Sequence, residues 1–520
     1  MGNEELQIER KKKTIEELLT FGKYTIILCF LLQFMILNQL GNLFFMSFSG
    51  LPPKIIGCGD NNFDGLNDIE VCDKYEKIKK NINGSTCDPQ LEYDFKSINV
   101  EFQYLCNDRI IMKNCISLEI IGVISGSLLG GLLSDKIGRR RIILFAITGS
   151  CIFGGLVSLT YGLIDFVIFR CGIGFFNGAS LAVLPVYIIE MINKKDRLWI
   201  MNVITWAPTA VIFSILAYIA KDWRILAQMS SGLAIPGILL VWFVEESPRW
   251  LIQKKKIEKA RQSLKNICKI NYGKKINIDE VVDEVITSEL IKQKESIIKN
   301  KKNYSFKHLY CTWKFTGYSI TLILIFFTGS FSKYGIVYNM ENVSGSPYMN
   351  VILIGLLRYF MNLSVAFCDV NFKNLGRRHI MITFILGITI SAIIIGIFNI
   401  LEKTSEYGLF IRILQISIVG FTSQFYVIGA LCSAELFPTP IRNMANGQLQ
   451  FFSRIGTVLS PYLFYLPYPY ILLCLLTLLT ATVFYFIIPE TKGIPLPENM
   501  PPLKGDKKCN EELKKMIEVR

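Results

Sequence analysis

The sequence predicts an all-α membrane protein with twelve transmembrane helices in two six-helix halves. Hydrophobic residues make up 51% of its 520 residues, which is more than a soluble protein of this size normally carries. Apolar runs of about 20 residues recur along the chain, and each is long enough to cross the hydrocarbon core as a helix. A basic Gly-Arg-Arg turn also follows both the second and the eighth predicted span, which indicates an internal repeat.

The two Gly-Arg-Arg turns, called GRR turns below, set the predicted topology. The first lies within Gly130–Arg141, between two apolar runs, and the second ends at Arg378. Short basic connections collect on the cytoplasmic side, so we expect both turns and both termini inside. The repeat is degenerate, since Lys373 occupies the place that Asp135 has in the first turn.

These boundaries divide the chain into five parts. A charged tail precedes the first span, and a lysine-rich linker without an apolar run separates the halves. The fifth and eleventh spans are expected at 199–220 and 443–465. Within the linker, the apolar spacing of 257–270 predicts an amphipathic helix, whose charges either bind anionic lipid or are simply solvated. The predicted parts are the N-terminal tail 1–23, the first half 24–244 with its outer loop 47–109, the linker 245–314, the second half 315–488 and the C-terminal tail 489–520.

The long loop after the first span is predicted to fold outside the cell. Four of the 14 cysteines, Cys58, Cys72, Cys87 and Cys106, lie in it, and Asn83 begins a glycosylation sequon. Four cysteines indicate two disulfides, with three connectivities open. The other cysteines are scattered as packing residues, and with two histidines in all we expect no metal site and no cofactor.

Further motifs narrow the family. E-S-P-R-W-L at Glu246–Leu251 follows the sixth span, and P-E-T-K-G at Pro489–Gly493 follows the twelfth. With the cysteine-bearing loop and the run S-A-E-L-F-P-T-P-I-R-N at Ser433–Asn443, the chain resembles the organic cation/anion/carnitine transporter family (solute carrier family 22) of the major facilitator superfamily. The resemblance implies a multi-pass plasma-membrane transporter of small organic ions that works by rocker-switch alternating access.

Charged residues at the inner helix ends are predicted to form gating ion pairs. Such pairs would be intact in one state of the transporter and broken in the other. The alternative is that these charges only set topology, although acidic residues contribute little to topology. The predicted set is Asp135, Arg139, Arg140, Glu190 and Arg249 in the first half, and Arg377, Glu435 and Arg442 in the second.

Charged residues inside the predicted spans are candidates for binding the substrate. Arg454 lies roughly 16 Å into its span, and relatives that carry anions or carnitine have a basic residue near this position, so we expect it to bind a substrate carboxylate or sulfate. The alternative is a structural pair with Glu119. Arg358 and Lys333 add positive charge, although Lys333 could instead snorkel to an interface. Arg170 is expected to be structural, and Glu119 is expected to pair with an arginine.

Aromatic residues are the remaining predicted substrate contacts. Phe327, Phe331 and Tyr334 recur on one helical face, and the resemblance implies that Tyr334 lines the central cavity. Phe425, Tyr426 and Trp206 are further candidates. The alternative for every member of this set is ordinary packing.

The leading functional prediction is transport of organic anions or zwitterions across the lipid bilayer. The alternatives are a sugar porter, an organic cation transporter, or a membrane receptor on the same fold. A coupling ion and the oligomeric state stay open. The excess of basic residues is topogenic and does not indicate nucleic acid. An enzyme is not expected, because the linker holds no Gly-rich phosphate loop and one histidine.

Overall fold

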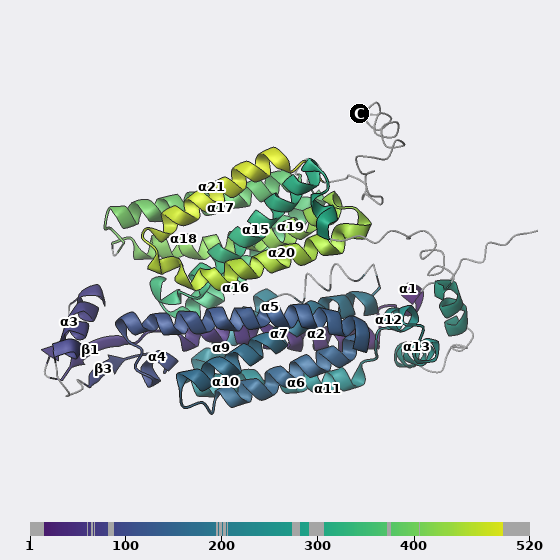
Figure 1. The fold of residues 1–520 in the computed structure, drawn as a ribbon, viewed down its shortest axis with the longest axis horizontal. Coiled ribbons are helices and arrows are strands. Elements are labelled where there is room, and N and C mark those ends of the chain that lie inside the picture. Colours follow the sequence, from purple (N-terminus) through teal and green to yellow (C-terminus); the bar gives the residue numbers. More distant parts are fainter. Residues whose placement is uncertain are drawn as a thin grey trace, which may run out of the picture. The chain divides into compact units, whose positions relative to one another are not determined.

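The computed structural model divides the chain into two compact units, residues 1–301 and 302–520, and their boundary falls inside the predicted linker. Figure 1 shows the helices of each unit running side by side. The structure describes residues 15–59, 61–63, 66, 68–81, 88–193, 196, 200, 204, 206–272, 281–290, 306–371, 376–404 and 406–491.

The first unit is a bundle of long apolar helices. α10 and α11 follow each other closely and together make one span, Trp223–Phe243. The helices are α2 (Lys23–Ser49), α5 (Ile110–Ile137), α6 (Arg139–Val157), α7 (Leu163–Met191), α9 (Trp206–Ala220), α10 (Trp223–Gly232) and α11 (Ala234–Phe243).

The second unit repeats this plan. Here α18 and α19 form one span, Gly408–Leu436. The helices are α15 (Trp313–Val337), α16 (Pro347–Asn371), α17 (Arg377–Ile400), α18 (Gly408–Phe421), α19 (Ser423–Leu436), α20 (Thr439–Leu459) and α21 (Pro469–Ile487).

Ten helices of the described chain are long and apolar enough to cross a membrane. The predicted fifth and eleventh spans are not among them. The fifth corresponds to α9, whose apolar part, Ala207–Ala220, is short. The eleventh corresponds to α20, which carries Arg442 and Arg454 together with several amides. α9 is therefore apolar but shorter than an ordinary span, whereas α20 has the length but not the composition of a lipid-facing one.

Glycines let α5 and α7 pack closely in the first unit. A Cβ at Gly126 would overlap the backbone carbonyl of Phe175, and one at Gly178 would overlap that of Val123. A Cβ at Gly130 would lie 2.6 Å from the Cα of Ala179. Close backbone approach through small residues is the usual means by which membrane helices associate.

A small domain formed by residues 51–109, called the loop domain below, lies at one end of the first unit (Figure 1). Its antiparallel sheet has the order β2-β1-β3, from strands Asn61–Asn62, Lys54–Cys58 and Pro89–Glu92, and α3 (Asp68–Asn81) packs beside it. Ile55, Phe63, Val71, Tyr75 and Leu105 form its core.

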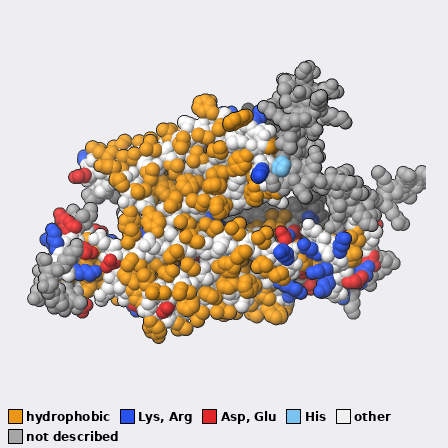
Figure 2. All heavy atoms as spheres, in the orientation of Figure 1, with side chains coloured by type: hydrophobic (Ala, Val, Ile, Leu, Met, Phe, Trp, Pro, Cys, Tyr) orange, Lys and Arg blue, Asp and Glu red, His pale blue; other side chains and the backbone are white. Residues whose placement is uncertain are grey.

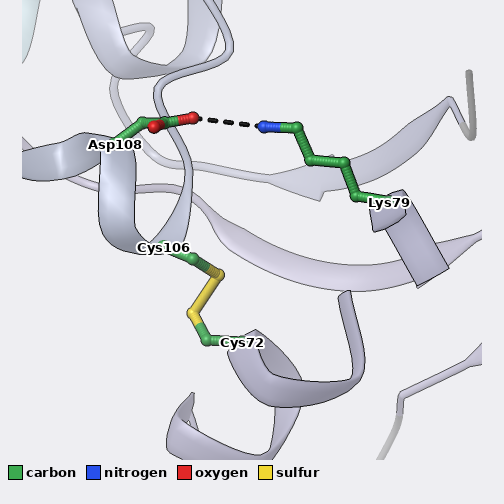
Figure 3. The surroundings of a disulfide bond; sticks show 4 residues. All are labelled: Cys72, Lys79, Cys106 and Asp108. Atoms are coloured by element: carbon green, nitrogen blue, oxygen red, sulfur yellow. Dashed lines mark hydrogen bonds and ion pairs between the residues drawn. A yellow bond between two sulfur atoms is a disulfide. The ribbon is translucent and has the colours of Figure 1, made fainter. Parts of the chain in front are cut away.

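A disulfide between Cys72 and Cys106 closes the loop domain (Figure 3). Nearby, Lys79 Nζ lies 3.2 Å from Asp108 Oδ2. Cys58 is also disulfide-bonded. Cys87 and the predicted glycosylation site Asn83 lie outside the described residues.

The loop domain is joined to the rest of its unit by an interaction group that we call the clamp. Lys96 exchanges backbone hydrogen bonds with Lys221 (2.8 Å) and Trp223 (3.0 Å). Arg224 Nη2 lies 2.5 Å from Glu101 Oε1, and its guanidinium also donates to the Ser158 carbonyl at the end of α6 (2.6 Å). The clamp therefore ties α4 (Ile98–Glu101) to the ends of α6 and α10.

Short helices pack together at the other end of the first unit. They are α1 (Ile15–Leu18), α12 (Pro248–Gln253), α13 (Ile257–Tyr272) and the helix at 281–290. The predicted amphipathic helix is confirmed as α13, since Ala260, Leu264 and Ile267 are fully buried in a core that also contains Ile15 and Val285.

Candidate functional site

The first GRR turn gathers charges from three helices, α5, α6 and α7. Arg139 begins α6 and is buried, with Nη1 at 2.5 Å from Asp135 Oδ1 and Nη2 at 3.5 Å from Glu190 Oε1. Asp135 is one turn earlier on α5, and Glu190 ends α7. Three residues of the predicted gating set therefore meet inside one unit.

Glu246 is the residue of this site that sequence reasoning missed. Its carboxylate accepts the backbone N–H groups of Arg139 (2.9 Å) and Arg140 (3.1 Å), and so caps α6 from 107 residues away. A helix N-terminus has unpaired N–H groups and partial positive charge, which a carboxylate satisfies. The available signal was an acidic residue just past the sixth span, inside the quoted E-S-P-R-W-L motif.

Arg140 does not form the predicted ion pair. Its guanidinium donates instead to the backbone carbonyls of Val241 and Trp242, both at 3.0 Å, at the end of α11. It therefore satisfies the unpaired carbonyls at a helix C-terminus. Arg249 lies half-buried near the start of α12, and its neighbour Trp250 donates an indole hydrogen bond to the Asp135 carbonyl (3.2 Å).

The second unit reproduces the same arrangement. Glu490 accepts the backbone N–H groups of Arg377 (2.9 Å) and Arg378 (3.2 Å), as Glu246 does in the first unit. Arg378 donates to the Tyr485 carbonyl near the end of α21, and Arg377 forms an ion pair with Glu435. The internal repeat is thus present in side-chain detail.

Arg442, the last predicted gating residue, is not in this group. Its Nε donates to the Phe437 carbonyl at 3.4 Å, and its Nη2 is buried without a hydrogen-bond partner among the described residues. The prediction that it pairs with Glu435 or its neighbours is therefore wrong for the described part of the chain. Lys373, the degenerate position of the repeat, lies outside that part.

Glu119 and Arg170 form a closed ion pair in the middle of the first unit. Arg170 Nη2 lies 2.7 Å from each oxygen of Glu119 and 2.7 Å from the Asn42 carbonyl. Its guanidinium also lies 4.7 Å from the centre of the Phe45 ring. The pairing predicted for Glu119 and the structural role predicted for Arg170 are confirmed, because each satisfies the other within the first unit.

Lys333 lies inside the second unit and not at an interface. Its side chain is 3% exposed, with Nζ at 3.2 Å from the Tyr334 hydroxyl. The ammonium also lies over two aromatic rings, at 4.3 Å from the centre of Tyr334 and 5.6 Å from that of Tyr426. The snorkelling alternative is therefore wrong, and aromatic faces supply part of the stabilisation that water would give.

Two arginines act on the same lysine. Arg358 and Arg454 are both close enough to Lys333 to repel its charge. Among the described residues, Arg454 has neither a hydrogen bond nor an ion pair, and Arg358 Nε is buried without an acceptor. The structure thus brings together the predicted cations of the second half. We call Lys333, Arg358 and Arg454 the cation group.

Polar side chains connect this group to neighbouring helices. Ser330 Oγ lies 2.8 Å from the Tyr426 hydroxyl and 2.6 Å from Ser453 Oγ, and Ser453 directly precedes Arg454. These contacts join α15, α19 and α20 around the cation group.

The predicted aromatic residues form two stacked pairs and one fully buried ring. Phe327 stacks on Phe331 with 6.0 Å between ring centres, and Tyr334 stacks on Tyr338 at 5.3 Å. Phe425 is completely buried against Gly329, which favours packing. Trp206 begins α9, and its side chain is outside the described residues.

The described chain thus combines membrane-length apolar helices with a GRR site that recurs in both units. Residues 75–501 match the family model described as "Sugar (and other) transporter". The chain therefore belongs to this family of transporters. The predicted helical membrane fold is confirmed, whereas the predicted count of twelve spans is not, since ten membrane-length helices are found among the described residues.

Several curated relatives are described as solute carrier family 22 members. The chain is 28% identical over 416 residues to solute carrier family 22 member 16 of Xenopus laevis, covering 78% of this chain and 70% of that protein. It is also 28% identical over 416 residues to organic cation/carnitine transporter 2 of Homo sapiens, covering 78% and 71%. Solute carrier family 22 member 7 of Rattus norvegicus is 26% identical, covering 80% and 77%.

Solved structures share the fold. The D-xylose-proton symporter matches with a TM-score of 0.60 at 16% identity, covering 91% of this chain and 100% of that one. The POT family transporter PepTSo matches with a TM-score of 0.56 at 11% identity, covering 89% and 98%. At these identities the likeness concerns the fold alone.

Proposed function

We propose that the protein is a plasma-membrane transporter of small organic anions or zwitterions, with both termini in the cytoplasm. The observation that supports this proposal is the cation group of the second unit. Lys333, Arg358 and Arg454 are partly or fully buried, and both arginines lie close enough to Lys333 to repel its charge. The salt bridges of the described residues include neither arginine.

Electrostatics favours an anionic substrate. Buried charges of like sign raise one another's free energy, and removal from water adds a further cost to each. A carboxylate, sulfate or phosphate that enters such a group offsets both terms. Arginine can grip a planar anion through two parallel hydrogen bonds, and Tyr334 and Tyr426 supply hydroxyls and aromatic faces for the rest of the ligand.

The relatives' names fit this proposal. One is described as an organic cation/carnitine transporter, and carnitine is a zwitterion with a carboxylate. A purely cationic substrate would be repelled by the cation group. A sugar has no charge with which to balance it, and the xylose symporters share only the fold.

We further propose rocker-switch alternating access with gates at the two GRR sites. Asp135, Arg139 and Glu190 in the first unit, and Arg377 and Glu435 in the second, are ion pairs at helix ends. Ion pairs of this kind bias a conformational equilibrium when they exist in one state and break in the other. Glu246 and Glu490 hold the arginine-bearing helix starts in place.

Uptake by cells that express the full chain tests the substrate class. The labelled probes are estrone sulfate, carnitine, tetraethylammonium and glucose. We expect uptake of the sulfate or of carnitine, and none of tetraethylammonium or glucose above background. Arg454→Ala should lower anion uptake at least about tenfold, the factor that corresponds to one lost charge-assisted contact.

Controls separate binding from folding. Arg454→Lys keeps the charge and should retain part of the uptake, whereas Lys314→Ala removes an exposed charge at the start of α15 and should have no effect. Surface biotinylation normalises each variant. Undiminished anion uptake by Arg454→Ala at normal surface level would contradict the proposed polarity.

A further inference from the structure

Three consecutive lysines follow α12 on a turn that is fixed by backbone hydrogen bonds. We call Lys254, Lys255 and Lys256 the lysine turn. The amide of Lys256 donates to Leu251 and that of Lys255 to Ile252, both at 2.9 Å, which closes the C-terminus of α12. Lys255 has φ of 59°, a left-handed conformation that glycine normally supplies at such a position. The turn therefore holds its three lysines at fixed backbone positions.

The acidic residue nearest in sequence to the lysine turn, Glu258, pairs with Arg261 and not with a lysine. Lys254, Lys255 and the nearby Lys259 are exposed, with no ion pair among the described residues. The acidic groups of this region are engaged elsewhere, because Glu258 and Asp283 lie 3.0 Å and 2.6 Å from Arg261.

The neighbouring contacts add charge and rigidity. Lys256 Nζ lies 5.0 Å from the centre of the Trp250 ring, and the Trp250 indole is bonded to the end of α5. Exposed Lys136 and Arg141 belong to the GRR turn at this end of the unit. The result is a rigid surface with unbalanced positive charge.

This surface lies beside the lipid-facing part of the first unit. Trp242 and Phe243 end α11 with exposed fractions of 66% and 69%, and α12 begins five residues after Phe243. Exposed aromatic residues at the end of a span mark the membrane interface. Figure 2 shows lysine and arginine side chains gathered directly next to the hydrophobic surface, at the end where Figure 1 places α12 and α13.

We propose that the lysine turn, together with Lys259, binds the phosphate headgroups of anionic phospholipids in the adjacent leaflet. The backbone of the turn is fixed, which keeps the lysines beside the membrane surface. Their flexible side chains can then carry the ammonium groups to the lipid phosphates. Position favours a lipid over a soluble acidic partner, because the turn lies next to the apolar surface. Only the choice of the cytoplasmic leaflet rests on the proposed topology.

Lipid titration of the purified full chain in detergent tests this inference. Dioctanoyl phosphatidylserine is the probe, dioctanoyl phosphatidylcholine the zwitterionic reference and a polyglutamate peptide the soluble acidic reference, with binding followed by native mass spectrometry. Each lysine near an anionic surface contributes roughly a fivefold change in affinity. Lys254→Gln, Lys255→Gln and Lys259→Gln combined should therefore weaken phosphatidylserine binding on the order of a hundredfold.

Two matched triple variants complete the design. The same three positions changed to Arg keep the charge and should keep the binding. Lys54→Gln, Lys74→Gln and Lys77→Gln remove three exposed lysines from the loop domain, at the opposite end of the unit, and should change nothing.

The outcomes are distinct. Equal binding of the two lipids by the wild-type chain, or undiminished phosphatidylserine binding by the glutamine variant, would overturn the inference. Tighter binding of polyglutamate than of phosphatidylserine would overturn it in favour of an acidic protein partner. The titration involves no transport, so its failure is separate from failure of the uptake experiment.

Discussion

Three arginines within the bundles show how surroundings decide the role of one residue type. The guanidinium of Arg170 is satisfied by a carboxylate, a backbone carbonyl and an aromatic ring, those of Glu119, Asn42 and Phe45. Arg378 satisfies a backbone carbonyl at a helix end. Arg454 has no such partner among the described residues, although it lies near Lys333. An arginine that the fold leaves unsatisfied is the one that a ligand can use.

The Glu119–Arg170 pair gives a prediction about stability. Glu119→Gln leaves the guanidinium buried without its counter-charge, which costs roughly 3–5 kcal/mol. Thermal unfolding in detergent should show a clear fall in the melting temperature. Replacing both residues by uncharged ones, as in Glu119→Gln with Arg170→Met, should recover part of it. A single variant as stable as the wild-type chain would argue against a tightly coupled pair.

Glu101 in the clamp gives a prediction about pH. Burial raises its pKa, but hydrogen bonds from Arg224 and Trp223 outweigh burial, so the pKa lies below its ordinary value. Lys96, beside it, loses stabilisation through burial but has a raised pKa overall because of Glu101 and Asp222. The clamp therefore contributes stability above the unfolded-state pKa of about 4.3 and loses it as the pH falls through the folded value.

The melting temperature as a function of pH tests this sign. The melting temperature of the wild-type chain should fall as the pH drops below the ordinary glutamate value of about 4.3 and through the lowered pKa of Glu101. The Glu101→Gln variant should have a lower melting temperature than the wild-type chain at pH 7, and its melting temperature should fall less on acidification. Parallel pH profiles of the two proteins would show that another carboxylate is responsible.

At the scale of elements, distant residues decide where helices begin and how closely they pack. Glu246 and Glu490 cap the starts of α6 and α17 after whole spans of intervening chain. Close packing of α5 on α7 depends on glycines that face the partner helix, whereas Gly131 of α5 has no atom within 4 Å of its Cβ position.

Two glycines of α5 therefore form a matched pair for mutation. Gly126→Ala puts a methyl group into the Phe175 carbonyl and should destabilise the unit by about 1–3 kcal/mol, as overpacking does. Gly131→Ala meets open space and should be neutral or slightly stabilising, because alanine favours helix. The melting temperatures of the two variants are the measurement. Equal effects would mean that α5 and α7 are not in close contact.

At the scale of the whole molecule, the two units repeat one arrangement of charges at helix ends. Arg139–Glu190 with Glu246 in the first unit corresponds to Arg377–Glu435 with Glu490 in the second. The loop domain and the lysine turn, which lie at opposite ends of the first unit, have no described counterpart in this repeat.

The proposed topology predicts opposite sides for those two features. Lys74→Cys in the loop domain should react with an impermeant maleimide on intact cells, whereas Lys255→Cys should react only after permeabilisation. Both positions are exposed, so accessibility reports sidedness. The unsubstituted chain gives the background labelling. Reaction of Lys255→Cys on intact cells would reverse the assigned orientation.

Local sequence determined much of this protein. Apolar runs predicted the spans because a helix is the structure that satisfies backbone groups in lipid, and the GRR turns predicted the repeat. Asp135 and Arg139 were predictable partners, because both belong to the same short turn, on either side of Gly138. The position of Arg454 within its span was likewise readable from its distance to the span's start.

Tertiary structure decided the partners that are far apart in sequence. Glu119 could have paired with any intramembrane arginine, and only helix packing brings it to Arg170. Arg140 was expected in an ion pair, yet the end of α11 offers it carbonyls. Glu246 had no predicted role within its motif, and the fold brings its carboxylate to the N-terminus of α6. Sequence fixes which groups must be satisfied, but the choice of partner depends on distances that only the folded chain sets.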